Sequence, residues 1–252
     1  MLTPYTLRAM RPDRRACDQL RPVTIEVGAL PYPEGSCVIS TGATRVICTA
    51  SVEDRVPPFR KGSGLGWITA EYAMLPRSTQ TRTERDGRRG RVDGRVQEIQ
   101  RLIGRSLRGA VEPAALGERS ILIDCDVVVA DGGTRTASIT GGYVALALAI
   151  RALEEARVLR PGALRRQVAA VSAGIVAGEP RLDLCYLEDA AADTDMNCVG
   201  ARDGGFIEIQ GTAEQAPFRR EELARLIELA EQGLDRLYAA QDEALGSLPA
   251  AG

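Results

Sequence analysis

Short runs of apolar and β-branched residues, separated by Gly, Pro and Ser, make up most of the first third of the chain. Branched side chains pack well on a pleated surface, so runs bounded by turn-forming residues are typical of strands. We therefore predict strands at residues 23–27, 37–40, 45–51 and 67–73. The first nine residues show no such pattern, and we expect them to be a flexible N-terminal extension.

The hydrophobic spacing changes after residue 93. Apolar side chains now recur every three or four positions, as on one face of a helix, at Val96, Ile99, Ile103, Leu107 and Ala110. Asp93-Gly94 supplies a start signal for this helix, and Glu112-Pro113 supplies a stop signal. Apolar and polar residues then alternate over residues 120–130, which predicts a strand. Small and apolar residues over about 134–157 predict a second, buried helix.

Strand-like and helix-like segments also mix in the last third of the chain. Apolar runs predict strands at residues 168–177, 182–187 and 205–210, and a helical stripe predicts a closing helix at about 219–244. Strands and helices do not alternate strictly, and no long linker divides them. We therefore expect an α+β fold, a single compact domain of mixed sheet and packed helices. It should span residues 10–245, followed by a C-terminal tail at 246–252.

The absence of histidine narrows the chemistry more than the overall composition does. The 252 residues are 44% hydrophobic and 26% charged, with a net charge of −2, which is ordinary for a folded protein. Without histidine, Ser-His-Asp and Cys-His catalysis, a histidine base and histidine-ligated zinc are excluded. Lys61 is the one lysine among 32 basic residues, so arginine carries the positive charge. Any reaction must depend on carboxylates, arginines, hydroxyls, thiols or a hard metal.

The six cysteines are widely spaced and include no Cys-x-x-Cys pair. That usage indicates reduced thiols and a cytoplasmic protein, since a disulfide or zinc framework has characteristic spacing. No signal peptide or apolar run of membrane length stands out, and we expect no membrane partner.

A basic segment covers residues 77–95, where seven arginines outnumber three acidic residues. Arginine grips phosphate oxygens with a fork of donors, which suits the backbone of a nucleic acid. Few aromatic residues lie nearby, so we interpret the segment as capturing backbone rather than reading bases. A solvated charged loop is the simpler alternative for such a run taken alone.

A second candidate is the sequence Asp131-Gly132-Gly133-Thr134-Arg135, at a predicted strand-to-helix junction. Paired glycines let the backbone approach a ligand closely, and the start of a helix offers free N–H groups to an anion. Thr134 adds a hydroxyl and Arg135 a guanidinium, while Arg95 lies at the other predicted helix start. This composition fits a phosphate pocket; an N-cap turn with an incidental arginine is the alternative.

The third candidate is an acidic segment at residues 183–195, which contains no basic residue. Its five carboxylates are Asp183, Glu188, Asp189, Asp193 and Asp195. Asp183 and Asp189 are six positions apart, so they share one face if a strand continues between them. Paired carboxylates without histidine suit Mg²⁺, which keeps several waters and contacts substrate phosphates. An acidic strand end and loop held in water explains the same composition. Together, the three segments indicate phosphoryl chemistry on a nucleic acid.

Several long motifs occur in an order that is highly specific. They are Asp-Gln-Leu-Arg-Pro-Val at 18–23, Gly-Trp-Ile-Thr-Ala-Glu-Tyr at 66–72, Gln-Glu-Ile-Gln-Arg-Leu-Ile-Gly-Arg at 97–105, Ala-Asp-Gly-Gly-Thr-Arg-Thr-Ala-Ser-Ile-Thr-Gly at 130–141, Thr-Asp-Met-Asn at 194–197 and Glu-Ile-Gln-Gly-Thr-Ala-Glu at 208–214. From about residue 10 to 241 the chain resembles the ribonuclease PH family. The resemblance implies a ribonuclease PH-like fold, also described as ribosomal protein S5 domain 2-like.

The resemblance also implies roles for particular residues. The phosphate-binding group falls on Arg95, Gly133, Thr134 and Arg135. The catalytic, metal-linked acidic pair resembles Asp183 and Asp189, with Asp195 as a competing metal ligand. The arginines that grip RNA resemble Arg77, Arg82 and Arg85. The implied cofactor is Mg²⁺, and inorganic phosphate is the implied co-substrate.

The implied activity is phosphate-dependent 3′-to-5′ shortening of RNA. Phosphate attacks the terminal phosphodiester, a nucleoside diphosphate leaves, and the reverse reaction adds nucleotides. The implied partners are RNA, chiefly tRNA precursors, with rRNA processing or decay as a further role, and the implied assembly is a homo-hexamer, a trimer of dimers. Two alternatives are a non-catalytic RNA-binding ring subunit of an exosome-like assembly and a Mg²⁺ phosphohydrolase for small phosphate esters.

Overall fold

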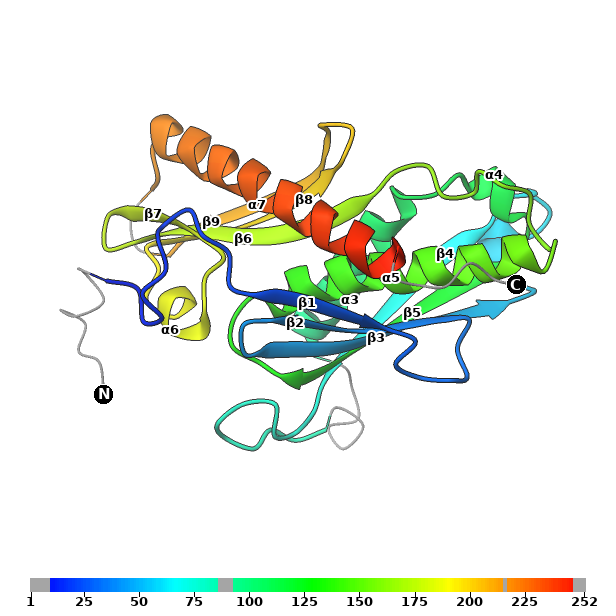
Figure 1. The fold of residues 1–252 in the computed structure, drawn as a ribbon, viewed down its shortest axis with the longest axis horizontal. Coiled ribbons are helices and arrows are strands. Elements are labelled where there is room, and N and C mark those ends of the chain that lie inside the picture. The colour runs from blue at the N-terminus through cyan, green and yellow to red at the C-terminus, as the bar shows by residue number, and fades with distance from the viewer. Residues whose placement is uncertain (1–9, 86–92, 215–216, 247–252) are drawn as a thin grey trace.

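The computed structural model describes residues 10–85, 93–214 and 217–246, and its first sheet is built from the N-terminal half (Figure 1). The strands follow the order β1-β2-β3-β5-β4 across the sheet: β1 (Val23–Val27), β2 (Gly35–Thr41), β3 (Thr44–Glu53), β4 (Trp67–Met74) and β5 (Ser120–Val129). Neighbouring strands are antiparallel except β4 and β5, which are parallel. The short turns η1 (Pro58–Arg60) and α4 (Pro113–Leu116) lie in the connections.

The second sheet comes from the C-terminal half and is antiparallel throughout its described strands. Its order is β7-β6-β8-β9, formed by β6 (Val168–Val176), β7 (Glu179–Leu182), β8 (Thr194–Ala201) and β9 (Phe206–Ala213). A single-turn helix, α6 (Tyr186–Asp189), lies between β7 and β8. The second sheet therefore places the acidic segment at one of its ends.

One buried helix, α5 (Thr134–Glu155), joins the two sheets, because it packs on β2 and β3 of the first and on β6 of the second. It is long and apolar enough to cross a membrane by length and composition, yet 83% of that stretch is buried inside the protein, as in a core helix. The amphipathic helix α3 (Gly94–Arg108) packs on β4, and α7 (Arg220–Gly246) lies along β6 and β7 (Figure 1). Both sheets thus share a core helix whose start faces the acidic segment.

The structure confirms the α+β class, the strands predicted before residue 130 and the three long helices. It corrects the region after residue 180. The strand predicted at 182–187 is wrong, because β7 ends at Leu182 and residues 186–189 form a helical turn. Strand β8 lies where we predicted none, since polar residues interrupt its apolar run. The extension predicted at 1–9 and most of the tail lie outside the described residues.

Candidate active site

A cavity of about 960 Å³ opens between the start of α3, the start of α5 and the second sheet. Its lining includes the arginines Arg95 and Arg135 and the carboxylates Asp189 and Asp195. A smaller hollow of about 300 Å³ shares all four of these residues and extends beneath them to Tyr72 and Thr134. The sequence-predicted phosphate residues and two of the predicted carboxylates therefore meet in one place.

The start of α5 forms the half of this cavity where the predicted phosphate-binding residues lie. Gly133 precedes the helix with a left-handed backbone (φ 66°), which glycine adopts without strain, and no side chain caps the helix there. The first backbone N–H groups and the positive end of the helix dipole are therefore directed toward the hollow. The guanidinium of Arg135 lies 3.8 Å from the Glu98 carboxylate of α3, which holds the two helix starts together.

Arg95 belongs to the first turn of α3 because Asp93 caps that helix. The Asp93 carboxylate accepts a 2.9 Å hydrogen bond from the Arg95 backbone N–H, as the predicted start signal required. The Arg95 side chain is exposed and lines both hollows. The predicted set Arg95, Gly133, Thr134 and Arg135 thus lines one hollow, the smaller of the two.

Tyr72 of β4 contacts the start of α5. Its hydroxyl lies 2.8 Å from the Thr134 hydroxyl. Burial raises the pKa of Tyr72, against the opposing influence of Arg95 and Arg135, so the phenol stays protonated at neutral pH. It therefore remains available as a hydrogen-bond donor beside the phosphate residues.

Asp189 and Asp195 form the carboxylate half. Asp189 ends α6, and Asp195 lies near the start of β8. Burial raises the pKa of Asp189. Burial and then repulsion from Asp189 raise the pKa of Asp195 to about 6, while Arg135 opposes both shifts. Two carboxylates that repel each other in a half-buried site favour a bound proton or a cation between them.

Asp183 does not belong to this pair, which corrects the sequence-based hypothesis. The strand that should have continued from it ends one residue earlier, and Asp183 itself has a left-handed backbone (φ 55°). Its side chain is buried and pairs with Arg21, whose guanidinium lies 2.7 Å from the Asp183 carboxylate. Asp183 does not line either hollow. The spacing of six residues between Asp183 and Asp189 therefore does not place their carboxylates on one face. Asp195, instead of Asp183, shares the cavity with Asp189.

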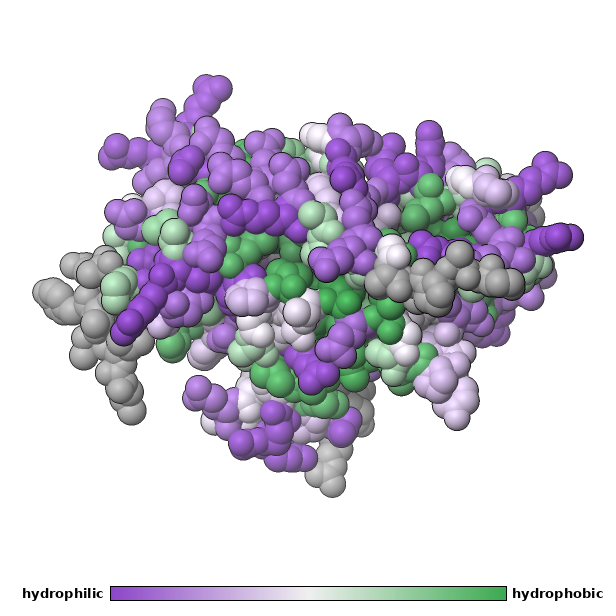
Figure 2. Space-filling model, viewed as in Figure 1, coloured by the Kyte–Doolittle hydropathy of each residue, from purple (hydrophilic) through white to green (hydrophobic). Residues whose placement is uncertain are grey.

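The predicted RNA-binding arginines lie on the loop after β4, which projects away from both sheets (Figure 1). Arg77, Arg82 and Arg85 are exposed, and hydrophilic side chains cover the loop in Figure 2. Thr79, from the same loop, lines the smaller hollow. The loop therefore connects the exposed arginines to the cavity. Three further arginines of the basic segment, at 88, 89 and 91, lie outside the described residues.

The structure adds polar residues that the sequence reasoning did not assign. Asn197 donates a 3.5 Å hydrogen bond to Asp195, and Gln210 donates a 3.1 Å bond to Glu98. All four line the larger cavity. Glu98, Asn197 and Gln210 each lie in a motif that served only for the resemblance, and that membership is the signal that could have identified them.

No group of three or more carboxylate or thiol side chains in the described ranges is placed to hold a metal ion. A Mg²⁺ ion commonly takes one or two protein carboxylates and completes its shell with water and substrate phosphate oxygens. The Asp189–Asp195 pair, with its mutual repulsion and raised pKa values, has the donor set that such an ion needs.

Comparisons with known proteins match most of the chain to one family. Profiles of the 3′ exoribonuclease family match residues 19–151 as domain 1 and residues 166–233 as domain 2. Ribonuclease PH of Methylobacterium radiotolerans is 55% identical over 236 residues, covering 94% of this chain and 100% of that protein. The family thus counts two domains where the sequence pattern predicted one unit, and α5 packs against the sheets of both.

Two solved structures share the fold at low identity. Rice Rrp46 matches with a TM-score of 0.74 and 20% identity, covering 93% of this chain and 100% of that chain. A chain of the Archaeoglobus fulgidus exosome with RNA bound to the active site matches with a TM-score of 0.75 and 19% identity, covering 92% of each. At these identities the likeness concerns the fold alone.

Proposed function

This chain belongs to the 3′ exoribonuclease family, and on that premise we propose that it is a phosphorolytic 3′-to-5′ exoribonuclease of the ribonuclease PH type. One observation carries the proposal: Arg95, Arg135 and the start of α5 share a cavity with the Asp189–Asp195 pair. Phosphorolysis needs an anion-binding site beside groups that manage charge and protons on a second phosphoryl group. This cavity supplies both halves.

Inorganic phosphate is held by the two arginines and by backbone N–H groups at the start of α5. Phosphate is already partly dianionic at neutral pH and is its own nucleophile. The protein therefore has to position it rather than activate it, and that explains why a chain without histidine can perform the reaction. Charge-assisted hydrogen bonds from arginine forks provide both affinity and orientation.

The bound phosphate attacks the terminal 3′–5′ phosphodiester of the RNA. The bond to the 3′ oxygen of the preceding nucleotide breaks, so the last nucleotide leaves as a nucleoside diphosphate and the shortened RNA ends in a 3′-hydroxyl. That 3′ oxygen takes up a proton as it leaves. Hydrogen phosphate carries such a proton into the reaction, so the step balances while both carboxylates stay ionised.

Mg²⁺ is the cofactor we propose for the carboxylate pair, with Asp189 and Asp195 as its protein ligands. When bound there, it would stabilise negative charge on the reacting phosphoryl oxygens. Asn197 keeps Asp195 oriented through its side-chain amide. Arg95 and Arg135 line the same cavity and bring positive charge to it.

The 3′ end of the RNA enters along the loop after β4. Arg77, Arg82 and Arg85 are exposed there and grip the phosphodiester backbone, with no stacking platform on the described part of the loop. Backbone contacts leave the base sequence unread, as successive removal of nucleotides requires. tRNA precursors are the proposed main substrate, and rRNA is a further one.

The first alternative, a non-catalytic ring subunit, is less well supported, because such a subunit needs neither the phosphate half nor the carboxylate half of the cavity. The second, a phosphohydrolase for small esters, leaves the exposed loop arginines without a role. We further propose a homo-hexamer arranged as a trimer of dimers, which light scattering would detect as six times 27.0 kDa. The reduced state of all six cysteines supports a cytoplasmic location.

The test is a tRNA precursor carrying extra 3′ nucleotides, incubated with Mg²⁺ and with or without phosphate. We expect shortening only with phosphate and release of nucleoside diphosphates. Shortening without phosphate, with monophosphate products, would indicate the hydrolytic alternative. RNA binding without shortening would indicate the non-catalytic subunit.

A further inference from the structure

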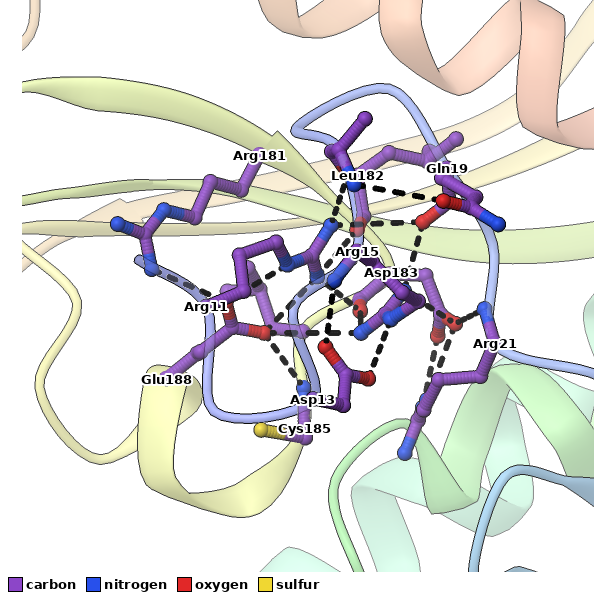
Figure 3. Close-up of polar contacts among 12 residues, drawn as sticks. Arg11, Asp13, Arg15, Gln19, Arg21, Arg181, Leu182, Asp183, Cys185 and Glu188 are labelled. Atoms are coloured by element: carbon purple, nitrogen blue, oxygen red, sulfur yellow. Dashed lines mark hydrogen bonds and ion pairs between the residues drawn. The ribbon is translucent and has the colours of Figure 1, made fainter. Parts of the chain in front are cut away.

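Arg21 is a buried arginine that lies outside the cavity yet contacts both of the turns that build it. It comes from the segment just before β1, and only 4% of it is exposed. Figure 3 shows it beside Asp183, at the edge of a network formed by the N-terminal segment and the residues before α6. A buried guanidinium needs a hydrogen-bond acceptor for each of its donors, so the partners of Arg21 show which segments it connects.

One set of partners belongs to the turn that precedes α6. The backbone N–H and the Nε of Arg21 donate to Oδ2 of Asp183 at 2.8 and 3.0 Å, and its Nη2 donates to Oδ1 at 2.7 Å. Burial alone would raise the pKa of Asp183, but the hydrogen bonds and charge of Arg21 hold that pKa below its usual value. Asp183 is therefore ionised and fixed, with only 3% of it exposed.

The other set belongs to the turn that precedes α5. Nη1 of Arg21 donates to the Asp131 carbonyl at 2.5 Å, and Nη2 lies 3.4 Å from the Gly132 carbonyl. This is the turn that delivers Gly133, Thr134 and Arg135 to the phosphate-binding half. One guanidinium thus spans the phosphate-binding turn and the turn that leads to the carboxylates.

The two turns also touch directly at their backbones. The backbone N–H of Tyr186 donates to the Asp131 carboxylate at 3.2 Å. A Cβ atom at Gly132 would lie 2.5 Å from the Leu184 carbonyl oxygen, so only glycine permits this approach. A close, polar contact therefore sets the relative position of the two turns, and Arg21 adds hydrogen bonds to both of them.

The network continues from Asp183 to the residue beside Asp189. Arg11 donates to the Asp183 carbonyl at 2.9 Å and to both carboxylate oxygens of Glu188 at 2.8 and 2.9 Å. Glu188 is fully buried and immediately precedes Asp189 on α6. The position of the Asp189 carboxylate therefore depends on the same buried charges that hold Asp183.

We propose that Arg21 is a positioning residue, which fixes the distance between the phosphate-binding turn at 131–133 and the carboxylate-bearing segment at 183–189. The inference rests on the proposed function, because it concerns the two halves of that same site. In-line attack demands that phosphate, the reacting phosphodiester and the carboxylates be aligned, and a displacement of about 1 Å costs about 100-fold in rate. A residue that touches neither substrate then affects both phosphate binding and turnover.

The test compares Arg21→Lys with the double variant Arg21→Met/Asp183→Asn. Lysine keeps the charge, but one ammonium group cannot reach Asp183 and both turn carbonyls together. The double variant removes both members of the Arg21–Asp183 pair, so it avoids the buried carboxylate that would keep only Arg15 as its charged partner and would destabilise Arg21→Met. The control is Gln167→Leu, which removes a buried side chain that donates to the Tyr238 carbonyl at 2.9 Å, outside both hollows.

We expect both Arg21 variants to fold and to bind inorganic phosphate about tenfold more weakly by calorimetry, with kcat reduced about 10- to 100-fold. The double variant should have a higher Tm than Arg21→Met alone without regaining activity. Gln167→Leu should lower Tm while phosphate Kd and kcat stay within about twofold, because it lies outside the site.

Folded Arg21 variants with phosphate Kd and kcat within about twofold of the unmodified protein would overturn the inference alone. An unmodified protein that binds no phosphate and forms no nucleoside diphosphate would overturn the proposed function, and with it this inference. The two failures are distinguishable because the second is seen before any substitution is made.

Discussion

The hydroxyl of Tyr72 lies 2.8 Å from the hydroxyl of Thr134, the first residue of α5. This contact joins a strand of the first sheet to the helix start that we propose binds phosphate, and both residues line the smaller hollow. It orients the Thr134 hydroxyl, so that the threonine presents a fixed donor or acceptor to a bound anion.

Tyr72→Phe removes that contact and changes little else. A neutral hydrogen bond contributes about 0.5–1.5 kcal/mol, so we expect the phosphate KM to rise about two- to tenfold with the RNA KM unchanged. Steady-state kinetics with varied phosphate measures this. An equal rise in both KM values would contradict a role confined to the phosphate half.

Arg135→Ala should weaken phosphate binding first. A charge-assisted contact contributes about 1.5–3 kcal/mol, which corresponds to about a 10- to 150-fold rise in phosphate KM. The matched control is Arg165→Ala, an exposed arginine paired with Glu112 at 2.7 Å, which lines neither hollow and should leave the phosphate KM unchanged. An unchanged phosphate KM in Arg135→Ala would contradict the assignment of this residue.

Asp195→Asn should stabilise the metal-free protein at neutral pH. Burial, followed by repulsion from Asp189, raises the pKa of Asp195 to about 6 from an ordinary 3.8. The folded chain therefore binds more protons than the unfolded chain between about pH 4 and 6, and this group's contribution to stability is lost as pH rises through that range. We expect the variant to exceed the unmodified protein by about 1–3 kcal/mol above pH 6 and to match it near pH 4.

Urea unfolding in the presence of a chelator, at both pH values, measures this difference. If the variant is also more stable than the unmodified protein at pH 4, the asparagine stabilises the fold by something other than the removal of a charge.

Asp183→Asn and Asp189→Asn should differ in their Mg²⁺ dependence. Asp183 contacts Arg21 and does not line the cavity, so its replacement should lower stability and kcat, and should raise the Mg²⁺ concentration for half-maximal activity less than replacement of Asp189 does. Asp189 lines the cavity together with Arg135, so its replacement should raise that concentration by about 10-fold or more. An equal rise in the Mg²⁺ requirement of both variants would favour the original sequence-based hypothesis, in which Asp183 and Asp189 both bind the metal.

The loop arginines should act on RNA alone. Replacement of Arg77, Arg82 and Arg85 by alanine, one at a time, should raise the RNA KM without changing the phosphate KM. Each phosphate contact removed should lower the slope of log affinity against log salt by about 0.7, the value for single strands. Arg225→Ala on α7, an exposed arginine paired with Glu228, is the control. A salt slope unchanged in all three would contradict RNA binding by this loop.

The grouping of Arg95, Gly133, Thr134 and Arg135 around one hollow could be predicted from the sequence because its signals are local. Asp93 caps α3 and Gly133 turns the chain into α5, and both tasks depend on residues within two or three positions. The helical and strand periods before residue 160 were equally local, and the structure confirms those elements.

The carboxylate half could not be predicted in full because its geometry is set by distant residues. The pairing of Asp183 with Asp189 depended on a strand that continues past Leu182. Instead, Arg11 and Arg21, more than 160 positions earlier, hold Asp183 and the following turn, and the chain bends with a left-handed residue there. Arg21 itself gave no signal beyond its place in the Asp-Gln-Leu-Arg-Pro-Val motif.

The most direct test of the central claim follows the phosphorus atom of inorganic phosphate. Radiolabelled phosphate is supplied to the unmodified protein with Mg²⁺ and an RNA that has free 3′ nucleotides, and the products are separated. We predict that the label appears in the β-phosphate of nucleoside diphosphates, in step with RNA shortening. Release of unlabelled nucleoside monophosphates, with all the label left in inorganic phosphate, would contradict phosphorolysis by this cavity.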